Sequence, residues 1–210
     1  MESHEKITIY TGIKLPKNHN KSIHFPLLCP IICKYNDFDF VNILNSYDVI
    51  ICTSDISINL VKNYLNFIKE KSFLVIGNTK LSSDFYNFKD AENLCNFLLK
   101  NKKFTDKKIL YLRGFDITFD LIKEFDLDEL IVYRTYFNQL IYQKFIDVIL
   151  NFKSSIFFIS KRGVDSFFIM IKNIPTTVEL SPNFKSEKIK NYFYQQFDNY
   201  EFKNNIICLA

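Results

Sequence analysis

Four short segments rich in hydroxyl, amide and glycine residues each follow an apolar run of the chain. They are residues 53–55 (Thr-Ser-Asp), 77–79 (Gly-Asn-Thr), 160–163 (Ser-Lys-Arg-Gly) and 181–183 (Ser-Pro-Asn). We expect each at a turn from a strand into a helix, where backbone N–H groups are unpaired and the helix dipole is positive. Such turns bind carboxylates or phosphates. Ordinary helix N-capping explains any single segment more simply, so it is the recurrence of four that favours an anion site.

The segments that must position these turns alternate between strand-like and helix-like patterns. Apolar residues recur at helical spacing in 55–70, 136–151 and 162–173. Strand-like runs occupy 6–11, 23–28, 48–53, 72–76, 108–112, 129–134, 154–159, 176–180 and 205–209. This alternation predicts an α/β fold with mostly parallel sheets flanked by helices. Because the carboxyl ends of parallel strands share one edge, we expect the four turns to gather at such edges.

The two halves of the chain show similar patterns at an offset of about 105 residues. Residues 6–12 (Lys-Ile-Thr-Ile-Tyr-Thr-Gly) resemble residues 108–114 (Lys-Ile-Leu-Tyr-Leu-Arg-Gly), and residues 50–54 resemble residues 157–160. Unrelated α/β stretches also share such patterns. The constant offset nevertheless favours two copies of one α/β unit over a single continuous sheet.

The composition is that of an ordinary soluble globular protein, 48% hydrophobic and 24% charged, with a net charge of +4. This charge mildly favours an anionic ligand, but no cluster of Lys and Arg has the density of a nucleic-acid surface. No run approaches the ~18 apolar residues that span a bilayer, and no apolar signal segment opens the sequence. The five Cys residues lie mostly in apolar runs, which predicts reduced thiols and a cytoplasmic protein.

Several common chemistries have no support in the sequence. The four Gly residues are too scattered for a phosphate-binding loop, and no Gly-x-Ser-x-Gly elbow occurs. His24, Cys29 and Cys33 have a loosely ligand-like spacing, but no second cluster completes a metal site, so we expect no metal. Asp55 and Asp116 follow different strands, which argues against the acidic cluster of a response regulator.

Six short motifs resemble, in the same order, those of the uroporphyrinogen-III synthase family. The strongest pair is Leu-Arg-Gly at 112–114 followed by Val-Tyr-Arg-Thr at 132–135. The others are Thr-Ser at 53–54, Val-Ile-Gly-Asn-Thr at 75–79, Phe-Ile-Ser at 158–160 and Leu-Ser-Pro at 180–182. One departure is that Thr11 is followed by Gly12 where the family usually has Arg-Pro and then a full helix.

The resemblance implies two similar α/β lobes joined by two antiparallel crossover linkers, with a hinge and a cleft that the four turns would face. The expected bounds are 1–30 with 136–210 for the discontinuous lobe, 34–133 for the inserted lobe, and about 28–36 and 132–137 for the linkers. Pro26 and Pro30 lack backbone donors, so the first linker fits an edge strand or an extended connection and not a central strand.

The resemblance also implies an activity, the cyclisation of hydroxymethylbilane to uroporphyrinogen III with inversion of ring D, in haem biosynthesis. Loss of hydroxide from this linear tetrapyrrole begins the reaction, and a neutral Tyr, with an ordinary pKa near ~10, can assist it. Tyr133 matches the family's Tyr, although a strand Tyr also suits an interface between lobes. No organic or metal cofactor is implied.

The substrate's carboxylates would be bound by main-chain donors at the turns and by nearby cations. The expected binding residues are Thr53, Ser54, Gly77, Asn78, Thr79, Arg113, Ser160, Lys161, Arg162, Gly163 and Ser181. Arg113 has two open roles, contact with a substrate carboxylate or internal pairing with a carboxylate such as Asp116. We expect a monomer that takes its substrate transiently from hydroxymethylbilane synthase. The alternatives are a non-catalytic two-lobed ligand-binding protein and a flavodoxin-like scaffold module.

Overall fold

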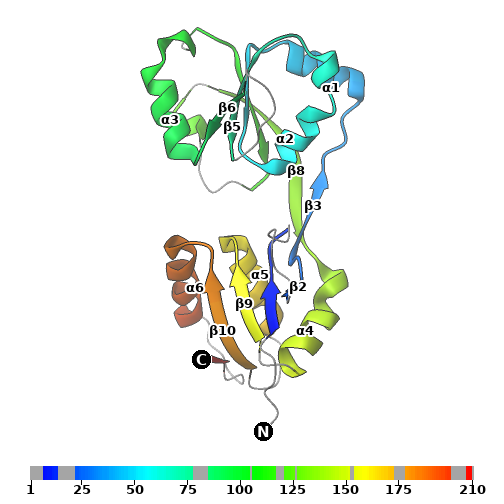
Figure 1. Cartoon of the computed structure of the whole chain (residues 1–210). Helices are drawn as coiled ribbons and strands as arrows, with labels where there is room; N and C mark the ends of the chain where they lie inside the picture. Colours follow the sequence, from blue (N-terminus) through cyan, green and yellow to red (C-terminus); the bar gives the residue numbers. More distant parts are fainter. Residues whose placement is uncertain are drawn as a thin grey trace. The chain divides into compact units, whose positions relative to one another are not determined.

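The computed structural model divides the chain into two compact units (Figure 1). The discontinuous unit comprises Met1–Pro30 with Tyr136–Ala210, and the inserted unit comprises Ile31–Thr135. The structure describes residues 7–13, 22–77, 85–104, 106–116, 121–125, 127–151, 154–172, 178–199 and 207–209. Asn78 and Thr79, both expected in the binding site, lie outside these residues.

The inserted unit is built on a six-stranded sheet in the order β3-β8-β7-β4-β5-β6. Its strands are β3 (Leu28–Ile32), β4 (Val49–Cys52), β5 (Ser72–Ile76), β6 (Phe85–Phe88), β7 (Ile109–Gly114) and β8 (Asp128–Phe137). From β8 to β6 all neighbouring strands pair in parallel. Its helices are α1 (Asp37–Asn45), α2 (Asp55–Lys62) and α3 (Ala91–Lys100), with short 3-10 helices η1 (Leu65–Phe67), η2 (Lys102–Phe104) and η3 (Leu121–Lys123).

Helices cover both faces of this sheet because the buried strand residues alternate between two cores. Ile50 and Cys52 pack with Phe40 and Leu44 of α1 and with residues of α2. The intervening strand residues, such as Ile51, pack on the other face with residues of α3. Continuous apolar strands buried on both faces are typical of parallel sheets.

The chain enters the inserted unit along β3 and leaves it along β8, and these two strands are neighbours in the sheet. The backbone N–H of Asn138 donates to the carbonyl of Leu27, and that of Cys33 donates to the carbonyl of Val132, both at 2.9 Å. The partner numbers fall on one strand as they rise on the other, so the two crossings are antiparallel.

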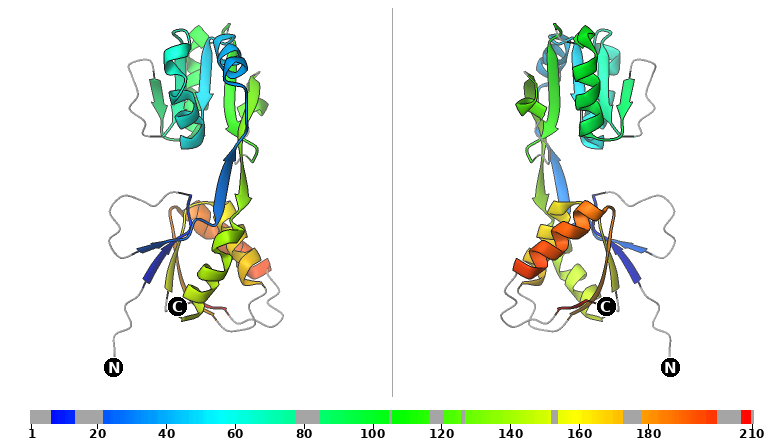
Figure 2. Two further views of the ribbon diagram at one scale, coloured as in Figure 1. Left: turned by 90° about the vertical axis from the view of Figure 1, so that its right-hand side faces the viewer. Right: turned by 90° about the vertical axis from the view of Figure 1, so that its left-hand side faces the viewer.

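The discontinuous unit has a five-stranded sheet in the order β11-β10-β9-β1-β2, with parallel pairing throughout. Its strands are β1 (Ile7–Tyr10), β2 (Ser22–His24), β9 (Ser154–Phe158), β10 (Val178–Phe184) and β11 (Ile207–Leu209). Its helices are α4 (Tyr142–Asn151), α5 (Lys161–Ile171) and α6 (Glu187–Asn199), with the 3-10 helix η4 (Gln139–Ile141) before α4. The three α-helices lie on one side of the sheet (Figure 2).

Phenylalanine builds the core between these helices and their sheet. Phe145 of α4, Phe167 of α5 and Phe193 of α6 pack with Ile156 and Phe158 of β9, and all five are almost fully buried. Aromatic pairs in offset or edge-to-face geometry add stabilisation beyond the burial of their area. The ring centroids of Phe158 and Phe167, for example, lie 5.2 Å apart in an edge-to-face arrangement.

The structure confirms the predicted α/β class with parallel sheets flanked by helices, but several expected bounds are wrong. The helix expected over 55–70 ends at Lys62, and a turn and η1 follow. The helix expected from residue 136 starts at Tyr142, because β8 continues to Phe137. None of the helices in the described part is both long and apolar enough to cross a lipid bilayer.

Candidate functional site

A cavity of about 380 Å³ lies where the strands of the inserted unit's sheet end. Its lining comes from strand ends, the turns after them and the start of α3, namely Thr53, Ile76, Lys89, Asp90, Ala91, Tyr111, Gly114, Asp116, Leu121 and Tyr133. The carboxyl edge of a parallel sheet is where α/β proteins bind ligands. Two residues selected from the sequence, Thr53 and Tyr133, therefore line one cavity.

Tyr133 is half-buried, and a register irregularity in the sheet sets its position. Arg113 of β7 pairs with Ile131, but the next residue, Gly114, pairs with Tyr133 and so skips Val132. A β-bulge of this kind re-aims the side chain that follows it. A Cβ atom on Gly114 would lie 2.6 Å from Cζ and 2.9 Å from Oη of Tyr133, so the phenol occupies space that only glycine leaves open.

Two hydroxyl side chains, those of Thr53 and Ser54, follow β4, and one of them has a structural role as a helix cap. Ser54 caps α2, because its Oγ accepts a hydrogen bond from the backbone N–H of Ser57 at 3.2 Å. Thr53 Oγ1 lies 3.2 Å from Oη of Tyr111, within the cavity lining. Of these two, Thr53 is thus the side chain that the geometry places at the cavity.

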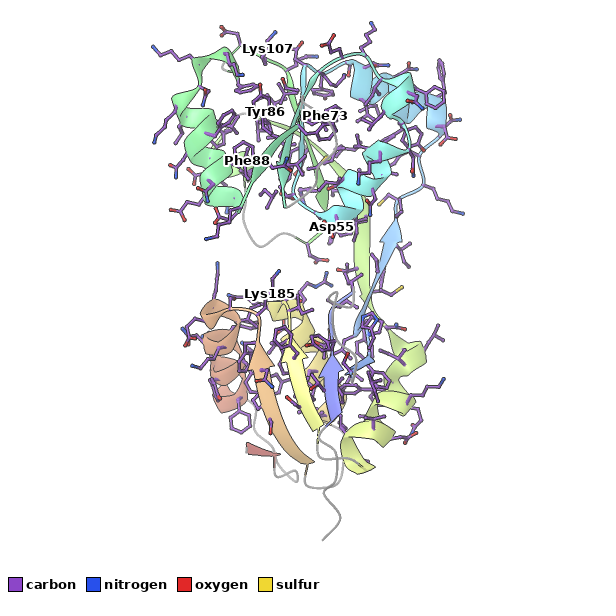
Figure 3. The ribbon with its side chains drawn as sticks, viewed as in Figure 1. Asp55, Phe73, Tyr86, Phe88, Lys107 and Lys185 are labelled. Atoms are coloured by element: carbon purple, nitrogen blue, oxygen red, sulfur yellow. The ribbon has the colours of Figure 1, made fainter. Side chains whose placement is uncertain are left out.

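Acidic residues that are not among the expected binding residues also lie at this edge. Asp90 caps α3, with Oδ1 accepting from the backbone N–H of Asn93 at 2.9 Å, and this hydrogen bond holds the pKa of Asp90 below its usual value. Asp116 lines the same cavity. Asp55 opens α2 (Figure 3). The position of Asp90 before the apolar repeat of Leu94 was a capping signal available in the sequence.

Gly77 follows β5 with φ of 130°, a conformation that favours glycine. Its N–H donates to the carbonyl of Phe88 at 2.9 Å, which joins the ends of β5 and β6. The sequence pattern predicted a helix directly after this turn. The next element in the described residues is instead β6, and α3 follows it.

Arg113 forms internal contacts, and its side chain is only 12% exposed. Its Nε donates to Oε2 of Glu129 at 2.5 Å, and its Nη1 donates to the carbonyls of Gly114 and Phe115, each at 3.0 Å. These contacts tie the end of β7 to β8 beside Tyr133. Of the two roles left open by the sequence, they support internal pairing, with Glu129 as the carboxylate.

In the discontinuous unit, Ser160 caps α5 by accepting a hydrogen bond from the N–H of Gly163 at 3.1 Å. Gly163 is buried, and a Cβ there would meet Oγ of Ser160 at 3.3 Å. Lys161 and Arg162 lie in the first turn of α5, which like that of α4 contains no acidic residue, whereas α1, α2, α3 and α6 each have at least one there. Two cations at the positive end of a helix are locally unfavourable.

Lys161 is held by residues that the sequence analysis missed. Its Nζ lies 4.5 Å from the ring centroid of Tyr192 on α6. The Tyr192 hydroxyl donates to Oδ1 of Asp165 at 2.7 Å. Burial, followed by this contact with Asp165, raises the pKa of Tyr192 to about 12. The phenol therefore stays a neutral donor at physiological pH, and the ring beneath Lys161 is fixed.

Ser181 was expected at a strand-to-helix turn, and the structure corrects this placement. It lies inside β10 opposite Ser155, whose hydroxyl donates to the Ser181 carbonyl at 3.2 Å. The turn before α6 is formed by Lys185 and Ser186. Pairing with β11 ends at Leu180, so the missing N–H of Pro182 costs no hydrogen bond on that side and the strand continues.

Lys185 joins Lys161 and Arg162 at the carboxyl edge of the discontinuous unit's sheet (Figure 3). Its backbone N–H donates to the carbonyl of Phe158 at the end of β9, at 3.0 Å. On β2, at the other side of this sheet, Nε2 of His24 lies 2.6 Å from the carbonyl oxygen of Gly12. Across the described ranges, no group of three or more His, Cys, Asp or Glu side chains is placed to hold a metal ion.

The fold has a counterpart among solved structures. The crystal structure of uroporphyrinogen-III synthetase from Helicobacter pylori 26695 matches with a TM-score of 0.57 and 14% sequence identity. The match covers 96% of this chain and 92% of that one. At this identity, the similarity establishes a shared fold. No protein-family model and no curated protein sequence matches the chain.

Proposed function

We propose that this chain is a uroporphyrinogen-III synthase, which cyclises hydroxymethylbilane with inversion of ring D in tetrapyrrole biosynthesis. The observation that carries the proposal is the phenol of Tyr133 in a cavity at the carboxyl edge of a sheet. The motif Val-Tyr-Arg-Thr around it and the fold match over 96% of the chain support the same reading.

In this proposal Tyr133 assists the first step. Its hydroxyl donates a proton to the hydroxymethyl oxygen of ring A as the carbon–oxygen bond breaks, and water leaves. Ring D of the resulting azafulvene then attacks the former hydroxymethyl carbon through its own substituted carbon to give a spiro intermediate. This intermediate fragments and recloses with ring D inverted, and the proton that ring D loses at the new bond restores the phenol of Tyr133. Positioning of the flexible chain does most of the remaining work, because the pyrroles supply the reactive electrons.

The charges at the two sheet edges suit different parts of this substrate. Asp90 and Asp116 line the cavity that contains Tyr133 together with one cation, Lys89, so carboxylates are in excess and positive charge that develops on the pyrrole there is stabilised. The same carboxylates repel the substrate's acetate and propionate groups. We therefore assign recognition of those groups mainly to Lys161, Arg162 and Lys185 at the edge of the discontinuous unit.

The deciding assay supplies freshly made hydroxymethylbilane and separates the type III product from the type I product of spontaneous closure. Excess type III product is the expected result. A purified, folded protein that gives only type I product would overturn the enzyme proposal. Tight binding of the substrate without turnover would then favour the non-catalytic ligand-binding alternative.

Replacing Tyr133 by Phe removes the proposed proton donor and keeps the ring. We expect the rate of type III formation to fall about 10- to 100-fold, since general acid catalysis contributes at least this much. Tyr136→Phe is the matched control, because Tyr136 lies on the same strand, is 49% exposed and does not line the cavity. Equal rates in both variants would remove Tyr133 from the mechanism.

A further inference from the structure

A second cavity, of about 470 Å³, lies at the opposite edge of the inserted unit's sheet. It is lined by Asn45, Tyr47, Asp48, Val49, Lys69, Glu70, Lys71, Ser72, Tyr86, Lys103, Phe104 and Lys107. Val49 and Ser72 are the first residues of β4 and β5, whereas the Tyr133 cavity lies at their ends. A four-residue strand such as β4 separates its two ends by roughly 13 Å, so the cavities are distinct.

The cavity contains a buried lysine. Lys71 is only 9% exposed, and its ammonium group donates to the carbonyls of Leu44 and of Tyr47, the latter at 2.8 Å. Burial lowers the pKa of Lys71. An ammonium group has three donors, and within the described residues only these two carbonyls accept from it. One donor of a costly buried cation is therefore left for another acceptor.

Three further lysines line the same cavity from different elements. Lys103 Nζ donates to Oη of Tyr86 at 3.1 Å and lies 4.8 Å from the centroid of that ring. Figure 3 labels Tyr86 and Lys107 in the inserted unit. Among the residues that the structure describes, the ammonium groups of Lys69 and Lys107 have neither a hydrogen bond nor an ion pair.

The lining of this cavity has more positive than negative side chains, and a bound dianion would balance the difference. Four ammonium groups share the lining with two carboxylates, those of Asp48 and Glu70. Asp48 Oδ2 already accepts the backbone N–H of Lys108 at 3.0 Å. A phosphate monoester carries about −1.5 to −2 charges at neutral pH and several strong acceptor oxygens, and lysine is a common phosphate ligand.

We propose that this cavity binds a small phosphate-bearing anion, a diphosphate or a phosphate ester. Its volume is in the range of small-ligand sites. Lys71 provides a fixed donor at the wall, Lys69 lies two residues before it in the same connection, and Lys103 of η2 and Lys107 line the cavity from other segments. The site is independent of Tyr133 and of the proposed cyclisation.

Calorimetric titration with inorganic pyrophosphate tests the proposal on the full chain. The double variant Lys69→Gln/Lys107→Gln removes two ammonium groups from the lining without altering buried Lys71. We expect its Kd to rise at least tenfold. The control is Lys62→Gln/Lys100→Gln, which removes the same charge from exposed ends of α2 and α3 outside the cavity and should change Kd less than twofold.

Four outcomes would overturn the proposal. The first is no pyrophosphate binding by the unaltered protein up to millimolar concentration, and the second is an equal loss of affinity in the two double variants. The third is a loss that appears only in Lys161→Gln/Arg162→Gln, which would place the anion at the other unit. Titration with citrate separates phosphate from carboxylate recognition, and equal affinity for citrate would reject the phosphate assignment.

Discussion

At the scale of single residues, the fit between Tyr133 and Gly114 determines where the proposed proton donor lies. The bulge between β7 and β8 brings the two residues opposite each other, and the absence of a side chain on Gly114 makes room for the phenol. The ion pair between Arg113 and Glu129 joins β7 to β8 next to this bulge. The geometry of the phenol thus depends on residues that have no chemical role of their own.

Gly114→Ala tests this dependence. The new Cβ would lie 2.6 Å from the ring, so Tyr133 must move, and we expect a loss of rate similar to that of Tyr133→Phe. Far-ultraviolet circular dichroism checks that the fold is retained. In the double variant Gly114→Ala/Tyr133→Phe the losses should not add, because both act on one group. Fully additive losses would show that Gly114 acts by another route.

The pair of Tyr192 and Asp165 belongs to the same scale and predicts a pH dependence of stability. The pKa of Tyr192 rises from about 10 when unfolded to about 12 when folded, so its hydrogen bond stabilises fully below pH 10 and loses its effect as pH rises through 12. Tyr192→Phe should lower the free energy of unfolding by about 1 kcal/mol at pH 8. Urea unfolding of both proteins at pH 8 and pH 11.5 measures this, and a difference that does not shrink at the higher pH would contradict it.

At the scale of elements, the start of α5 combines two adjacent cations with no acidic residue. Its cations, Lys161 and Arg162, oppose the helix dipole, which costs about 0.3–1 kcal/mol for each charge. The cation–π contact of Lys161 with the ring of Tyr192 offsets this cost by a similar free energy. Sequences that break a local rule in this way often do so at functional sites.

Replacing Lys161 by Gln separates binding from stability. Because the unfavourable dipole contact and the favourable ring contact are lost together, the free energy of unfolding should change by less than about 0.5 kcal/mol. The KM for hydroxymethylbilane should rise about tenfold, as expected when a charged contact is removed. Lys144→Gln on α4, an exposed lysine distant in sequence, is the control. An unchanged KM would exclude Lys161 from substrate binding.

The limits of sequence-based prediction also show at the level of elements. The alternation of strand-like and helix-like segments predicted the parallel sheets. Strands that are buried on both faces are apolar along their whole length, so they stand out in the sequence. Ser181 was misplaced because the length of β10 depends on where β11 stops pairing, a contact between distant segments. Lys71 and Tyr192 gave no signal, since their burial and partners arise only when separate elements pack together.

At the scale of the whole molecule, charge is distributed unevenly between the two sheet edges. The cavity edge of the inserted unit carries Asp90 and Asp116 with Lys89, and the corresponding edge of the discontinuous unit carries Lys161, Arg162 and Lys185 with Glu187 at the start of α6. A net charge of +4 does not reveal this division. The net positive edge of the discontinuous unit therefore attracts a polyanionic ligand.

This arrangement predicts how the reaction responds to salt. Attraction between exposed charges falls as the screening length shortens from about 10 Å at 0.1 M salt to about 3 Å at 1 M. We expect KM to rise several-fold over this range while kcat changes little, as measured by initial rates. A substrate with esterified carboxylates should show no such rise, and a salt-independent KM for the natural substrate would contradict electrostatic recognition.

The antiparallel crossings have a consequence for how the gene can be rearranged. Because β3 and β8 run side by side, the two ends of the inserted unit leave the discontinuous unit at one point. A tight reverse turn joining these strands would bridge the gap left by excising residues 31–135. The inserted unit can in this sense be removed or replaced as one segment of the gene, while the backbone of the discontinuous unit keeps its path.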